Sequence, residues 1–123
     1  RDDSVALVTS LRGRVRQYVV SNGTVQAQTA KLRRSGLDRL MDGIFLSERI
    51  GAEKPDIAFF AAVFAAIGPV EKEEVLIVGD SLTSDIQGGR NAGIQTCWYA
   101  PAGGESPLPH HTIRDLHEVL ALL

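Results

Sequence analysis

Short apolar runs alternate along the chain with segments in which apolar residues recur at helical spacing. The runs predict strands over 15–22, 43–47, 74–79 and 94–100. The helical segments are predicted over 2–12, 24–35, 55–68, 85–92 and 114–123. Because strands and helices alternate, we expect a Rossmann-like α/β fold: a parallel sheet with right-handed crossovers and helices on both faces.

Residues that begin or end helices refine these bounds. Pro55 is expected to open the helix at 55–68, which the pair Gly68-Pro69 ends. Ser84 is expected to cap the helix at 85–92, with Gln87 at the capping-box spacing. The last helix is expected to turn its apolar side inward, and that side carries Leu116, Val119, Leu120 and Leu123.

Composition and charge exclude two classes of partner. With 123 residues, of which 44% are hydrophobic and 23% charged, the chain is expected to form one domain. Its formal net charge of -2 provides no basic field for nucleic acid, and no apolar run approaches the roughly 18 residues that cross a membrane. The single cysteine, Cys97, fits a reducing, cytoplasmic setting.

Polar side chains follow the predicted strands at the edge where open parallel sheets bind ligands. Ser21 and Asn22 end the first strand, Asp80 ends the third, and Asp85 comes five residues later. Lys54 lies a few residues after the second strand, directly before a predicted helix. The topology therefore predicts that a hydroxyl, an amide, an ammonium group and two carboxylates gather at one edge of the sheet.

These groups suit a magnesium ion and a phosphoryl group. Mg²⁺ favours one or two carboxylates together with water and phosphate oxygens, and Asp80 and Asp85 could supply the carboxylates. The Ser21 hydroxyl could bind phosphoryl oxygens, and the Lys54 ammonium could neutralise their charge. Ordinary alternatives stay open for single residues: a helix start for Asp85, a turn for Ser21 and a solvated surface for Lys54. The occurrence of all these residues together favours a site for magnesium and a phosphoryl group.

Three stretches in this order resemble the motifs of one family. VVSNG contains Ser21, GAEKPD contains Lys54, and VGDSLTSDIQGGRNAG contains Asp80 and Asp85. Together they resemble the second, third and fourth motifs of the haloacid dehalogenase (HAD) superfamily of phosphohydrolases, over nearly the whole chain. Within this superfamily the chain is most similar to the pyrimidine 5′-nucleotidase subgroup, through VSNG, RRSGL, SERIGAEKPD, SDIQGG and NAGIQTCW.

The resemblance implies a Mg²⁺-dependent phosphatase for a small phosphomonoester, with a nucleoside 5′-monophosphate as the expected substrate. An aspartate nucleophile would form an aspartyl-phosphate that water hydrolyses, and a second aspartate two residues on would act as general acid and base. Ser21 and Asn22 would bind the phosphate, and Lys54 would neutralise charge. Asp80 would hold Mg²⁺ directly, and Asp85 would hold it directly or through water. The glycines after Asp85 would let their helix pack closely against the sheet.

The family's first motif, Asp-x-Asp-x-Thr after a strand, is absent from these 123 residues. We interpret Asp2 and Asp3 as favourable charges at a helix start instead. The family's cap, which follows the first motif and selects the substrate, is absent too. Residues 1–123 are therefore expected to be the C-terminal portion of a HAD-like core domain, without the central strand between those that end at Ser21 and Asp80.

A sheet without its central strand would leave two unpaired edges. We expect the chain to pair with the missing N-terminal segment of the same protein, and to be inactive alone. The nearly apolar helix at 55–68 likewise predicts cover on more than one side. An alternative is a non-catalytic HAD-derived module that binds a partner through its open edges, and a homodimer stays open. A generic doubly wound domain would not explain Lys54, Asp80 and Asp85 together.

Several other residues are expected to have structural roles. Cys97 and Trp98 are expected to pack inside a strand. His110 and His111 follow a proline-rich loop and, as neighbours on an extended chain, should point to opposite faces and share no metal. Three arginines are expected on solvated faces: Arg33, Arg34 and Arg39.

Overall fold

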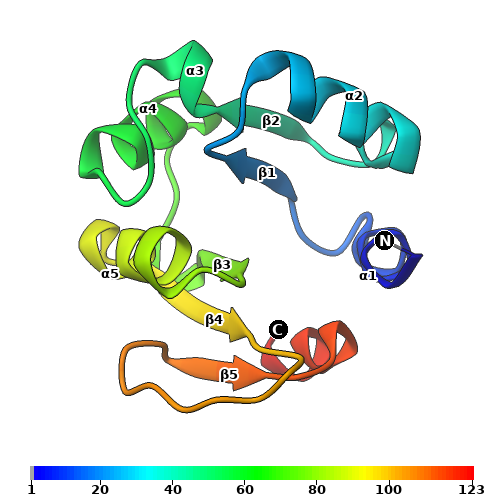
Figure 1. Cartoon of the computed structure of the whole chain (residues 1–123), viewed down its shortest axis with the longest axis vertical. Helices are drawn as coiled ribbons and strands as arrows, with labels where there is room; N and C mark the ends of the chain where they lie inside the picture. The colour runs from blue at the N-terminus through cyan, green and yellow to red at the C-terminus, as the bar shows by residue number, and fades with distance from the viewer. Residues whose placement is uncertain (1) are drawn as a thin grey trace. The chain divides into compact units, whose positions relative to one another are not determined.

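The computed structural model describes residues 2–123 and divides into two compact units, Arg1–Glu53 and Lys54–Leu123 (Figure 1). The strands are β1 (Tyr18–Ser21), β2 (Gly43–Leu46), β3 (Leu76–Gly79), β4 (Gln95–Tyr99) and β5 (His111–Ile113). The α-helices are α1 (Asp2–Leu11), α2 (Val25–Ser35), α3 (Ser47–Ile50), α4 (Ile57–Ile67) and α5 (Gln87–Ala92). A π-helical turn spans Leu82–Ile86, and 3₁₀ turns span Leu37–Arg39, Lys72–Glu74 and Leu116–Leu122. None of the described helices has the length and apolar character that crossing a bilayer requires.

The first unit holds a two-stranded parallel sheet. β1 pairs with β2 so that Ser21 lies opposite Leu46, and both strands therefore end at the same edge. α2 follows β1 as predicted: the Thr24 side chain accepts from the N–H of Ala27, and Gly36 ends the helix at a φ of 82°. Leucines from α1, α2 and β2 are buried, namely Leu7, Leu11, Leu32 and Leu46.

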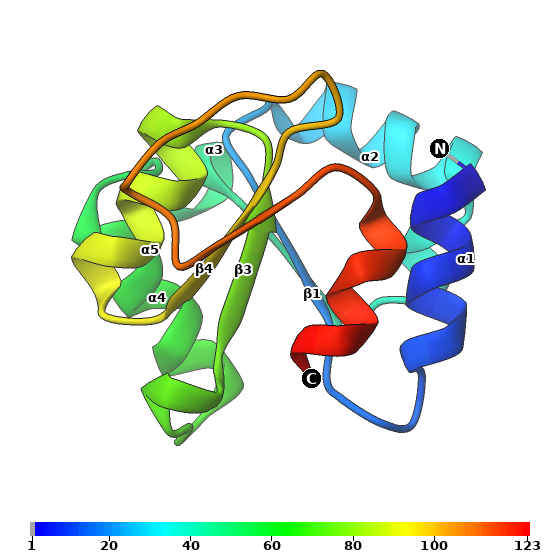
Figure 2. The ribbon, with the colours of Figure 1, turned by 90° about the horizontal axis from the view of Figure 1, so that it is seen from below.

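The second unit holds a three-stranded parallel sheet in the order β3-β4-β5. Helices α4 and α5 lie on one face of this sheet, and the C-terminal 3₁₀ helix lies on the other (Figure 2). A Cβ atom on Gly89 of α5 would lie only 2.6 Å from Thr96 Cγ2 and 2.7 Å from Ile77 Cγ2. The expected close packing of the glycine-containing helix against the sheet is therefore confirmed.

Two helix starts differ from the prediction because a side chain other than the expected one forms the cap. The helix expected from Pro55 begins at Ile57, after Asp56 Oδ1 accepts from the N–H of Ala58 at 2.9 Å. The helix expected from 85 is preceded by the π-helical turn. The residue that caps this turn is Ser81. Ser84 is not the cap, since its own N–H donates to Ser81 Oγ at 3.1 Å.

The C-terminal segment also differs from the prediction. Its helix is a 3₁₀ helix that begins at Leu116, where Asp115 and Glu118 form a reciprocal capping box. Leu116 and Val119 are buried as expected, but Leu123 is 53% exposed and does not face inward. β5 was not predicted, because a strand of three residues is too short to give a periodic pattern.

The described strands form two parallel sheets, and the unpaired strand edges that we expected are present. Among residues 2–123, β1 pairs with β2 alone and β3 with β4 alone, so each sheet keeps an edge that could accept a further strand. The apolar helix α4 buries Phe59, Phe60 and Val63, whereas Ile57 at its start is 59% exposed. Apolar surface therefore stays uncovered on this helix.

Candidate functional site

A buried ion pair joins Lys54 to Asp85 in the second unit. The Lys54 ammonium lies 2.5 Å from Asp85 Oδ1, and the two residues are only 7% and 8% exposed. Lys54 precedes α4, and its peptide bond to Pro55 is cis. The structure thus confirms that these two predicted site residues lie together, and it excludes a solvated surface position for Lys54.

The π-helical turn and a glycine place the Asp85 carboxylate at the end of β3. The carbonyl of Ser81 accepts from the N–H groups of both Asp85 and Ile86, which widens the turn. Asp85 Oδ2 then accepts from the N–H of Ser81 at 3.2 Å. A Cβ atom on Gly79 would lie 2.2 Å from Asp85 Oδ2, so only glycine leaves room for this carboxylate. The roles of Gly79 and Ser81 were not predicted.

Asp80 directly follows β3 and precedes Ser81, which binds Asp85. Asp80 is exposed, so a ligand from solution can reach it. Its main-chain carbonyl accepts from the indole N–H of Trp98 at 3.1 Å. Trp98 is half-buried at the end of β4 rather than fully buried as expected, because its indole reaches across to the end of β3.

Ser21 and Asn22 lie in the first unit, at the carboxyl end of β1. Ser21 Oγ accepts from the N–H of Gly23 at 3.1 Å, which leaves the hydroxyl hydrogen to donate to a further acceptor. Asn22 is exposed. Because these residues and Lys54 belong to different units, the predicted meeting of Ser21 with Lys54, Asp80 and Asp85 stays a prediction.

Asp80 and Asp85 fit the ligand requirements of Mg²⁺. Within residues 2–123, no group of three or more His, Cys, Asp or Glu side chains is arranged to hold a metal. Mg²⁺ does not need such a cage, because it takes one or two carboxylates and fills its other positions with water and phosphate oxygens. One exposed carboxylate and one buried carboxylate at the end of a strand match that requirement.

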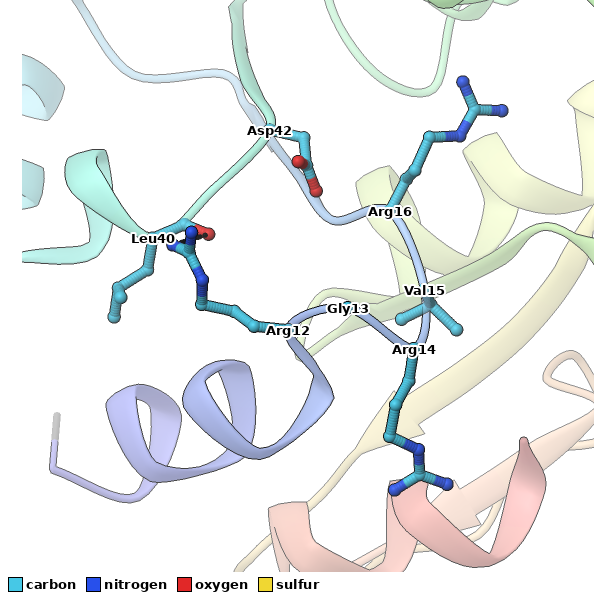
Figure 3. A pocket seen from close by; sticks show the side chains of 7 residues that line it. All are labelled: Arg12, Gly13, Arg14, Val15, Arg16, Leu40 and Asp42. Atoms are coloured by element: carbon cyan, nitrogen blue, oxygen red, sulfur yellow. Dashed lines mark hydrogen bonds between the residues drawn. The ribbon is translucent and has the colours of Figure 1, made fainter.

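A pocket of about 290 Å³ in the first unit does not include Ser21 or Asn22. It is lined by residues 12–16, Leu40 and Asp42, which precede β1 and β2, so it lies at the end of the strands opposite to Ser21. The arginine side chains in it point in different directions (Figure 3). Arg12 is already engaged, since its guanidinium donates to the carbonyl of Leu40 at 3.1 Å.

Cys97 is not a candidate nucleophile. It is fully buried in β4, as predicted, and burial together with the Glu118 carboxylate raises the pKa of its thiol from 9.0 to about 11. At about pH 8 we expect the native thiol to react with Ellman's reagent about 100-fold more slowly than the unfolded thiol, because its thiolate fraction is smaller. Equal rates, measured by absorbance with and without urea, would contradict this burial.

The remaining residues have structural positions. His110 Nδ1 accepts from the N–H of Thr96 at 3.0 Å. The pKa of His110 is lowered, mainly because its ring is desolvated and to a smaller extent because Arg90 and His111 lie nearby. His111 is exposed in β5. The three arginines predicted on solvated faces are exposed: Arg33, Arg34 and Arg39. The side chain of Asp2, which was interpreted as a helix-start charge, lies outside the described residues.

Known proteins are similar to this chain in sequence. Pyrimidine 5′-nucleotidase PynA of Streptococcus pneumoniae is 45% identical over 84 residues, which are 68% of this chain and 35% of that protein. Pyrimidine 5′-nucleotidase YjjG of Escherichia coli is 36% identical over 123 residues, which are 98% of this chain and 55% of that protein. The chain therefore spans about half of the length of these relatives, or less.

A solved structure and a family model agree with these relatives. The crystal structure of the HAD-hydrolase YfnB of Bacillus subtilis, bound to magnesium, matches with a TM-score of 0.94 at 39% identity. The match covers 100% of this chain and 55% of that one. The model of the haloacid dehalogenase-like hydrolases matches residues 1–93. The α/β fold, the motif residues and these matches agree, and the chain belongs to the haloacid dehalogenase-like hydrolase family.

Proposed function

We propose that the chain forms part of a magnesium-dependent phosphohydrolase that acts on phosphomonoesters, with a pyrimidine nucleoside 5′-monophosphate as its substrate. The observation that carries this proposal is the buried Lys54–Asp85 pair beside the exposed Asp80 at the end of β3. Two relatives named as pyrimidine 5′-nucleotidases support the substrate class. Our prediction of a cytoplasmic location accompanies this proposal.

Each residue of the site has a distinct part in the proposed reaction. Asp80 and Asp85 would hold Mg²⁺, which would offset negative charge on the phosphoryl group. Asp85 also orients Lys54, whose ammonium then faces developing charge from a buried position, where electrostatic interactions are stronger than in water. In the first unit, Ser21 donates its hydroxyl hydrogen to a phosphoryl oxygen, and Asn22 assists in orienting that group.

The nucleophile in this proposal comes from an Asp-x-Asp segment of the same protein, outside the 123 residues. Its strand would pair with the open edges of β1 and β3, and so complete a single sheet. One aspartate would attack phosphorus and release the alcohol, and water would then hydrolyse the aspartyl-phosphate. The second aspartate would protonate the leaving ester oxygen, which gives the alcohol, and would later deprotonate the attacking water.

A phosphate-release assay on the full-length gene product tests the proposal. We expect the fastest release from pyrimidine nucleoside 5′-monophosphates in a panel that includes purine nucleotides, sugar phosphates and p-nitrophenyl phosphate. Chelation with EDTA should stop the reaction, and added Mg²⁺ should restore it. The 123-residue chain alone should release no phosphate. A preference for sugar phosphates would overturn the substrate, and no release from any compound would overturn the reaction class.

A further inference from the structure

The indole of Trp98 contacts the main chain at the proposed metal ligand Asp80. In the β3–β4 ladder, Gly79 lies opposite Trp98 as the last paired residue of β3. Asp80 comes next, beyond the ladder, and its carbonyl accepts from the Trp98 Nε1–H at 3.1 Å. A side chain therefore supplies the hydrogen bond that the neighbouring strand no longer provides.

The peptide unit between Asp80 and Ser81 is held at both of its polar atoms. Trp98 binds its carbonyl at 3.1 Å, and Asp85 Oδ2 accepts from its N–H at 3.2 Å. With both atoms bound, the plane of this peptide cannot rotate without breaking a hydrogen bond. The orientation of this peptide constrains the main chain from which the Asp80 side chain projects.

The loop between β4 and β5 holds the indole in place. Gly104 of this loop lies against the ring, since a Cβ atom there would be 2.9 Å from Trp98 Cη2. The ring is thus packed on one side while its N–H reaches the end of β3. A residue fixed in this way can hold a metal ligand in one orientation.

We propose that Trp98 is a positioning residue for the magnesium site, acting through the Asp80 carbonyl. The proposal rests on the proposed function, in which Asp80 is a ligand of Mg²⁺. It assigns to the indole N–H a role separate from packing: the N–H keeps the Asp80 carboxylate directed for binding, so that less orientational freedom is lost when the ion binds.

Two substitutions of Trp98 separate the hydrogen bond from packing. Trp98→Phe keeps an aromatic ring and loses the N–H, whereas Trp98→Leu loses both. In the full-length protein we expect both variants to bind Mg²⁺ about 5- to 10-fold more weakly than the wild type, as loss of one hydrogen bond predicts. Calorimetric titration with MgCl₂ measures this affinity directly. Trp98→Leu should also have the lower melting temperature of the two, because it fills less volume.

The outcomes distinguish this inference from the proposed function. Asp80→Asn should remove Mg²⁺ binding, and if it binds like the wild type, the metal assignment and the inference both fail. If binding depends on Asp80 but Trp98→Phe matches the wild type, only the inference is overturned. If only Trp98→Leu binds Mg²⁺ more weakly, in proportion to its loss of stability, the inference is also overturned, because Trp98 then acts through packing alone.

Discussion

Replacing Lys54 with methionine is expected to lower the free energy of unfolding by about 3–5 kcal/mol, because the buried carboxylate of Asp85 would lose its cation. Methionine has a similar length and apolar stem, so the change removes the charge with little loss of volume. Urea denaturation followed by circular dichroism measures the effect in the full-length protein.

A second substitution separates the charge from the packing at this position. The double variant Lys54→Met with Asp85→Leu should recover most of the lost stability, because well-packed apolar residues can replace a buried ion pair. Recovery should stay incomplete, since the N–H of Ser81 would lose its acceptor. The matched control is Lys31→Met at an exposed position of helix α2, and its stability is expected within about 0.5 kcal/mol of the wild type. Wild-type stability in Lys54→Met would contradict a buried pair.

The sequence predicts the main elements of the fold wherever the pattern is long or the end signals are strong. The strand predicted over 74–79 is β3 (Leu76–Gly79), and Gly36 and Gly68 end helices where expected. The starts of helices were less predictable, because several neighbouring side chains could form each cap. Ser81 and Ser84 are only three residues apart, and the direction of the chain leaving β3 decides between them.

The sequence also predicted that Lys54 and Asp85 meet, and the structure places them in contact. The contacts that hold them were not predictable. The role of Gly79 depends on the π-helical turn, which brings Asp85 back onto the strand. The bond from Trp98 to Asp80 depends on the register of β3 against β4, which no periodic pattern specifies.

Replacing Asp80 with asparagine is expected to reduce Mg²⁺-dependent phosphate release by the full-length protein about 10³-fold or more. The reason is that a carboxylate that holds the ion is lost, and metal-ion stabilisation of the transition state accounts for several kcal/mol. Stability should change by less than about 0.5 kcal/mol, because Asp80 is exposed and its hydrogen bond with Trp98 uses the main-chain carbonyl. Steady-state kinetics against Mg²⁺ concentration, with urea denaturation in parallel, measures both quantities.

Asp85→Asn should behave differently, because Asp85 is both buried and paired with Lys54. That variant should lose activity and also stability, whereas Asp80→Asn should lose activity alone. The matched control is Asp56→Asn, which keeps an effective cap for α4 and should change neither quantity. An unchanged dependence of activity on Mg²⁺ concentration in Asp80→Asn would show that Asp80 does not hold the ion, and a large loss of its stability would show that its carboxylate has a structural role instead.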